Sequence, residues 1–126
     1  SIAASWAIPD EDSATALRAL DLVLRDGMLV PAVFWYEFRN VLIINERRGR
    51  LLVDETERAL VNLDDLFPHT DAALPGEQAM SFARAHRLTI YDAAYLDLAL
   101  RTGSSLATLD ARLATAAAAE GIPVIA

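Results

Sequence analysis

Three carboxylates stand out in this sequence because each lies within or directly after an apolar stretch. Glu37 lies in the run VFWYEF, Asp92 lies in the run TIYDAAYL, and Asp110 follows the run SSLATL. A carboxylate among apolar neighbours costs folding free energy unless it is paired, hydrogen-bonded or bound to a metal ion. The chain has no cysteine and only two histidines, so a metal site here would use oxygen ligands, which suit Mg²⁺ or Mn²⁺.

Such a site predicts metal-assisted hydrolysis of a phosphodiester. One ion lowers the pKa of a bound water to make the nucleophile, and the same or a second ion stabilises the leaving oxygen. Two polar residues could support the acids. Asn40 lies three residues after Glu37 and hence on the same helix face, and Thr108 points to the same side of its strand as Asp110.

Each of these residues also has a purely structural interpretation. Asp92 and Asp110 could simply cap the helices that begin near them, as aspartates at such positions usually do. Glu37 could form an ion pair with a nearby arginine. Asn40 could be a solvated polar residue, and Thr108 a buried strand threonine. The site is favoured because all three acids fall where one fold would bring them together.

The elements that must position these residues alternate between short apolar runs and longer helical patterns. We predict strands at residues 28–30, 69–73, 105–109 and 123–125, and helices at residues 13–26, 33–48, 54–66, 75–86, 91–101 and 111–120. This alternation indicates an α/β fold with a mainly parallel sheet covered on both faces, in which functional residues lie at the carboxyl ends of the strands. Asp97 lies five positions after Asp92, so its side chain points to a different side of the helix from Asp92, and we expect it at the surface.

Composition narrows the class of protein. The chain has 126 residues, of which 54% are apolar and 23% charged, and this suits one folded domain over residues 1–126. Charges interrupt every apolar stretch well before the ~20 residues that span a bilayer, so we expect a cytoplasmic protein with no membrane partner. The net charge of −7 disfavours non-specific binding to nucleic acid, although acids gathered in one cleft can bind cations that reverse the local potential.

Several segments together resemble the VapC branch of the PIN domains. They are the opening SIAASWAIPDE, the segment WYEFRN at residues 35–40, the segment LTIYDAAYLDLA at residues 88–99, ATLD at residues 107–110 and GIPV at residues 121–124. The resemblance spans nearly the whole chain in order and spacing. The spacing of 18 residues between Asp92 and Asp110 is its most specific part.

The resemblance implies a three-layer PIN-like domain and the toxin component of a type II toxin–antitoxin system. Such a toxin is an endoribonuclease that depends on Mg²⁺, with Mn²⁺ as the alternative. Glu37, Asp92 and Asp110 would be three of the four catalytic, metal-binding acids, with Asn40 and Thr108 as supporting polar residues. The partners implied are RNA, a cognate VapB-like antitoxin that sends an arginine into the acidic cleft, and a second copy of the chain in a homodimer.

The sequence departs from the family pattern at its start. Family members carry their first acid at the end of strand one, shortly before the position of Ser1, and this sequence has nothing there. We therefore expect an N-terminally truncated PIN domain whose first strand is largely missing. A molecule that really starts at Ser1 would be badly impaired in metal binding and cleavage.

Two other classes of protein compete with this interpretation. A catalytically inactive PIN-like binding or regulatory module is favoured by the missing first acid and opposed by the three acids that remain. A receiver-type or flavodoxin-like domain would also gather acids around Mg²⁺, but a receiver needs an active-site lysine and this chain has no lysine. A nucleotide-binding domain is disfavoured because no glycine-rich loop follows any strand.

Overall fold

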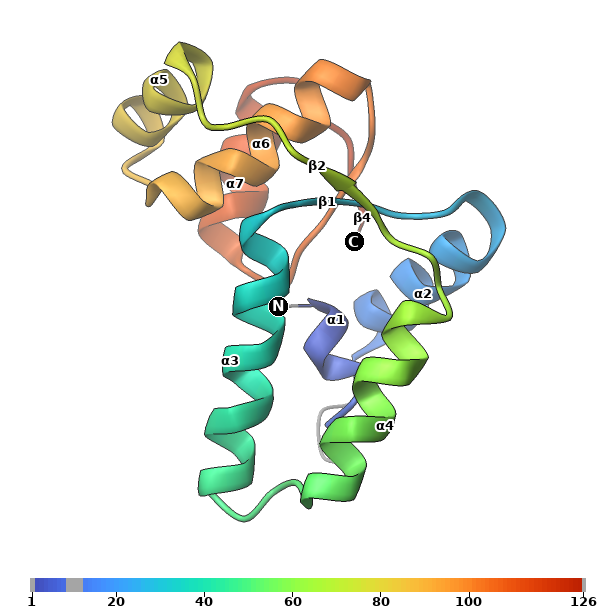
Figure 1. The fold of residues 1–126 in the computed structure, drawn as a ribbon. Helices are drawn as coiled ribbons and strands as arrows, with labels where there is room; N and C mark the ends of the chain where they lie inside the picture. Colours follow the sequence, from blue (N-terminus) through green and yellow to red (C-terminus); the bar gives the residue numbers. More distant parts are fainter. Residues whose placement is uncertain (1, 9–12, 126) are drawn as a thin grey trace.

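The computed structural model describes residues 2–8 and 13–125, and within them the chain alternates between helices and short strands (Figure 1). In chain order the elements are α1 (Ile2–Ser5), α2 (Ala14–Asp26), β1 (Leu29–Pro31), α3 (Val33–Arg47), α4 (Val53–Asp64), β2 (His69–Asp71), α5 (Glu77–His86), α6 (Ile90–Thr102), β3 (Leu106–Ala107), α7 (Ala111–Ala119) and β4 (Val124–Ile125). The α/β class is confirmed, and so is the predicted order of elements from α2 onwards; α1 was not predicted, and α5 begins two residues later than the predicted start at Pro75.

All four strands pair in parallel, as predicted, but in the described residues they form two separate two-stranded sheets. In one sheet β1 pairs with β2, with Leu29 opposite His69. In the other β3 pairs with β4, with Leu106 opposite Val124. Because β1 and β3 each have one strand neighbour, each has a second edge that no described strand covers.

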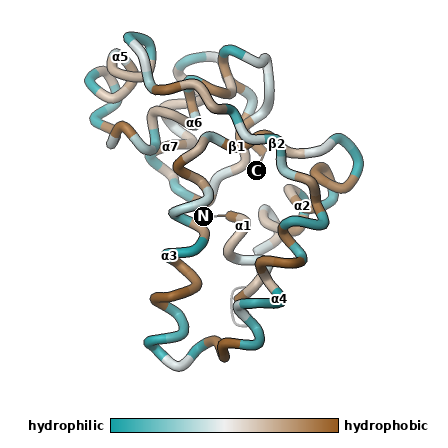
Figure 2. Tube along the Cα trace, viewed as in Figure 1, coloured by the Kyte–Doolittle hydropathy of each residue, from teal (hydrophilic) through white to brown (hydrophobic). Residues whose placement is uncertain are grey.

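Two hydrophobic clusters correspond to these two sheets. The first gathers α1, β1, α3 and α4 around the fully buried Phe38 and Leu42. The second gathers α5, α6, α7 and the β3–β4 sheet around Leu96. Apolar and polar residues alternate along α3 and α4, as the brown and teal bands of Figure 2 show, so each helix presents an apolar stripe to the first cluster. Tyr95 packs against both clusters.

Local capping signals explain where the helices nearest the strands begin and end. The Ser13 hydroxyl accepts a hydrogen bond from the backbone N–H of Ala16 at 3.2 Å and so caps α2. Gly27, with φ of 85°, ends that helix just before β1. Gly103, in the left-handed conformation, ends α6 just before β3.

The expectation that Asp97 lies at the surface is wrong. Its side chain accepts hydrogen bonds from Gln78 Nε2 and from Arg101 Nε, both at 2.8 Å, and the residue is only 8% exposed. Arg101 also donates through Nη2 to Asp71 at 2.6 Å. Helix α5 packs on α6 and covers this side, so a polar network joins α5, α6 and β2.

None of the helices in residues 2–8 and 13–125 combines the length and apolar character that crossing a membrane requires.

Candidate active site

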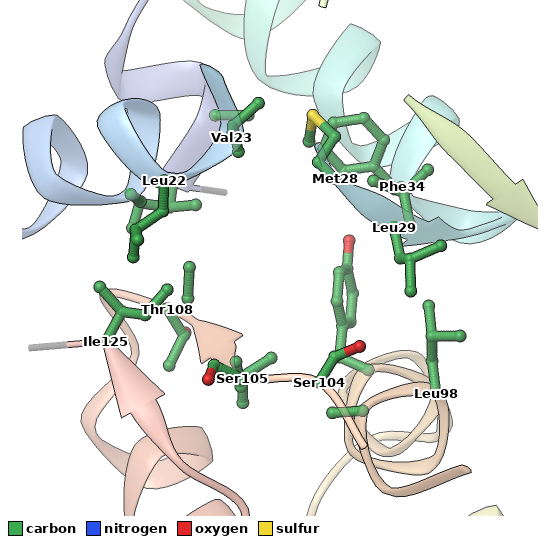
Figure 3. Close-up of a pocket in the computed structure, with 18 of the residues that line it drawn as sticks. Leu22, Val23, Met28, Leu29, Phe34, Leu98, Ser104, Ser105, Thr108 and Ile125 are labelled. Atoms are coloured by element: carbon green, nitrogen blue, oxygen red, sulfur yellow. The ribbon is translucent and has the colours of Figure 1, made fainter. Parts of the chain in front are cut away.

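A cavity of about 830 Å³ lies between the β1–β2 sheet and the β3–β4 sheet. Figure 3 shows part of its lining, with the apolar Leu22, Val23, Met28 and Phe34 on one side, and the polar Ser105 and Thr108 together with Ile125 on the other. The cavity reaches the end of β3, where the chain enters α7. It therefore occupies the position at which functional residues are expected in an α/β fold.

All three predicted acids line this cavity, although they come from three separate parts of the chain. Glu37 belongs to α3, Asp92 to the first turn of α6, and Asp110 is the residue that precedes α7. Glu37 and Asp92 are half-buried and Asp110 is exposed. Asp26 and His69 line the same cavity and are not among the predicted site residues; Asp26 ends α2 shortly before β1, and His69 is the first residue of β2.

The partner of Glu37 is a tyrosine and not the arginine of the structural alternative. The Tyr95 hydroxyl donates to Glu37 Oε1 at 2.6 Å. Burial is the main factor that raises the pKa of Tyr95 well above its usual range. The hydrogen bond to Glu37 and the negative charges of Glu37 and Asp92 raise it further, so the hydroxyl is a neutral hydrogen-bond donor. Sequence reasoning missed Tyr95, although its position three residues after Asp92 puts both on one face of α6.

Asp92 does not cap its helix. Thr89 is the N-cap of α6, and its hydroxyl accepts a hydrogen bond from the backbone N–H of Asp92 at 3.1 Å. Within the described part of the chain no hydrogen bond reaches the Asp92 carboxylate. The capping interpretation therefore fails for this acid, and its oxygens are available to a ligand in the cavity.

Asp110, in contrast, does cap its helix. Its Oδ1 accepts hydrogen bonds from the backbone N–H groups of Arg112 at 2.8 Å and Leu113 at 3.2 Å. Its other carboxylate oxygen has no hydrogen-bond donor among the described residues, so capping leaves it free for a second role. The Thr108 hydroxyl accepts from the backbone N–H of Asp110 at 3.0 Å, so Thr108 helps to fix the turn that carries this acid.

Asn40 is the one predicted residue that the structure does not bring to the cavity. It is exposed on α3 and is absent from the cavity lining. Its side chain has no hydrogen-bond partner among residues 2–8 and 13–125, so it remains free to contact a molecule outside the cavity.

The three acids fit a divalent cation in the kind of ligand they offer. Each has at least one carboxylate oxygen without a protein donor, and oxygen ligands are those that Mg²⁺ and Mn²⁺ prefer. In the described residues, however, no three acidic or histidine side chains lie close enough together to hold one ion. Binding one ion through all three acids would require the carboxylates to approach one another.

The chain belongs to the PIN-domain family, because the family model described as "PIN domain" matches residues 1–119. Within that family it is a VapC-type protein. It is 37% identical over 111 residues to "Ribonuclease VapC3" of Pyrobaculum aerophilum, and the similarity covers 85% of this chain and 82% of that protein. The resemblance in the sequence is thus confirmed, and the receiver-type and flavodoxin-like alternatives are wrong.

Proposed function

We propose that this protein is the toxin of a type II toxin–antitoxin system and a metal-dependent endoribonuclease that hydrolyses phosphodiester bonds of RNA. One observation carries the proposal: Glu37, Asp92 and Asp110 come from three separate elements and line one cavity of a PIN domain. The relative named as a ribonuclease supports the same activity.

Glu37, Asp92 and Asp110 would hold Mg²⁺, or Mn²⁺ in its place, through their free carboxylate oxygens. When bound, the ion supplies a water of lowered pKa and neutralises charge on the phosphate. Without a cation the three carboxylates repel an RNA backbone, so metal binding and substrate binding are coupled. Thr108 accepts a hydrogen bond from the backbone N–H of Asp110, and the exposed Asn40 would donate to a phosphate of RNA that extends beyond the cavity.

The partners follow from the same charge distribution. A net charge of −7 favours a basic partner, because opposite charge steers encounter. A VapB-like antitoxin that places an arginine among the three acids would neutralise them and block the cation. We also propose a homodimer, a cytoplasmic location, and RNA cleavage in single-stranded loops, where bases are accessible.

The proposed activity is tested on the full-length natural protein, freed of antitoxin and incubated with structured RNAs. We expect cleavage with Mg²⁺ or Mn²⁺ and none with EDTA. Asp92→Asn should lose at least the about 10- to 100-fold that is typical when a partner of a metal ligand is removed, because Asp92 is itself a proposed ligand. Asp54→Asn is the matched control, since Asp54 is an exposed aspartate in the first turn of α4. Equal cleavage by Asp92→Asn and the unsubstituted protein would contradict the assignment.

A PIN-like binding module without catalysis is the second candidate function. It is favoured by the separation of the acids, since no three of them lie close enough to share an ion in the described residues. The same assay decides between the two candidates. A folded, antitoxin-free protein that cleaves none of several RNAs with either metal would support the binding module.

A further inference from the structure

Tyr95 brings a hydroxyl group into the acidic cavity from the same helix face as Asp92. Its oxygen lies 2.6 Å from Glu37 Oε1, which is the length of a strong hydrogen bond to a carboxylate. Glu37 Oε2 has no hydrogen-bond partner in the described part of the chain. The tyrosine therefore occupies one oxygen of Glu37 and leaves the other open.

The tyrosine ring is itself held in place by packing. It is half-buried and contacts both hydrophobic clusters, so it bridges the two halves of the molecule. A glutamate has three flexible side-chain torsions, and a fixed donor removes much of that freedom. Because the hydroxyl donates its proton to Glu37 Oε1, it holds that carboxylate as a hydrogen-bond donor.

We propose that Tyr95 is a positioning residue that orients the Glu37 carboxylate for binding a divalent cation. The inference rests on the proposed function, because it assigns Tyr95 to the same cation site. It predicts that the hydroxyl, and not the ring, contributes to metal affinity. Removing a residue that orients a metal ligand typically weakens metal affinity by about 10- to 100-fold.

The test measures Mn²⁺ binding directly, without RNA. Free Mn²⁺ is quantified by electron paramagnetic resonance during titration of the full-length protein, and unfolding is measured separately in EDTA. We expect Tyr95→Phe to weaken Mn²⁺ binding about tenfold. Tyr91→Phe is the matched control, because Tyr91 lies on the same helix but is 58% exposed, and we expect its Mn²⁺ affinity to be unchanged.

A double variant separates positioning from a general structural role. If Tyr95 acts through Glu37, then Tyr95→Phe has no further effect on Mn²⁺ affinity in a Glu37→Gln background. Equal losses in both backgrounds, or an unchanged affinity in Tyr95→Phe alone, overturn the inference while leaving the metal site intact. If the unsubstituted protein does not bind Mn²⁺, the proposed metal-dependent activity and this inference fail together.

Discussion

Arg101 connects three parts of the structure, and its removal tests how α6 is held. Its Nε donates to Asp97 at 2.8 Å and its Nη2 donates to Asp71 at 2.6 Å. Asp97 is nearly buried and accepts a further hydrogen bond from Gln78. Since α6 also carries Asp92, this network fixes the helix that brings that acid to the cavity.

The change Arg101→Met removes the guanidinium and keeps an unbranched apolar stem. The bond to the buried carboxylate of Asp97 contributes about 1.5–3 kcal/mol, as hydrogen bonds to charged groups do. The pair with Asp71 contributes about 0–1 kcal/mol, because the two side chains are 38% and 22% exposed and solvent screens them. We expect Arg101→Met to lower the free energy of unfolding by roughly 2–3 kcal/mol, and Asp71→Asn by less than about 1 kcal/mol.

Equilibrium unfolding in urea, followed by circular dichroism at neutral pH, measures both losses. Asp71→Asn serves as the matched control, because it removes the exposed ion pair and leaves the bond between Arg101 and Asp97. Equal losses in the two variants would refute the reasoning, since the buried bond to Asp97 would then contribute nothing.

The pH dependence gives the same prediction a second readout. The hydrogen bond from Arg101, reinforced by its charge, holds the pKa of Asp71 below its ordinary value of 3.8. Because the pKa of Asp71 is lower in the folded protein than in the unfolded chain, the ion pair stabilises the fold fully at pH values above the unfolded-state pKa. This stabilisation is lost as the pH falls through the folded-state pKa. The difference between the unsubstituted protein and Asp71→Asn should be constant above about pH 5 and shrink as the pH falls below 3.8.

Two further predictions concern the capping role of Asp110 and the packing of α6. Asp110→Ser keeps a helix-capping oxygen, so its free energy of unfolding should stay within about 0.5 kcal/mol, whereas Asp110→Ala should lose about 1 kcal/mol. Both variants should lose RNA cleavage, and cleavage retained in Asp110→Ser would limit Asp110 to capping. Leu96→Ala should lose about 2–5 kcal/mol in urea unfolding because the residue is fully buried. Leu100→Ala, one turn later and 42% exposed, should lose less than about 1 kcal/mol, and similar losses in the two would contradict this packing.

Much of the fold could be predicted because its signals are local. Ser13 and Gly27 bracket α2 as a helix cap and a helix stop, and Gly103 ends α6 in the same way. Strands β1, β3 and β4 lie in apolar runs at about the residues expected, whereas β2 is a polar segment. The parallel pairing follows from the helices that connect the strands. These features depend on a few neighbouring residues, so sequence reasoning reaches them.

The errors concern contacts between elements that are distant in the sequence. The helical spacing predicts Asp97 at the surface because its side chain turns away from Asp92, but α6 is buried on more than one side. Helix α5 covers that second side and supplies Gln78 as a partner. Likewise, the sequence pattern around Asp92 and around Asp110 does not show which of these two residues caps its helix. The choice depends on Thr89, which already satisfies the first turn of α6.

The three acids of the cavity are held to different degrees, and this difference has a consequence for metal binding. Glu37 is bonded to a packed tyrosine, and Asp110 accepts two backbone hydrogen bonds at the start of α7. The Asp92 carboxylate has no hydrogen-bond donor among the described residues, so its side chain has the most freedom to move towards a cation. If the three acids hold a cation as proposed, we expect most of the approach that one ion requires to come from the Asp92 side chain, because Glu37 and Asp110 are already held by hydrogen bonds.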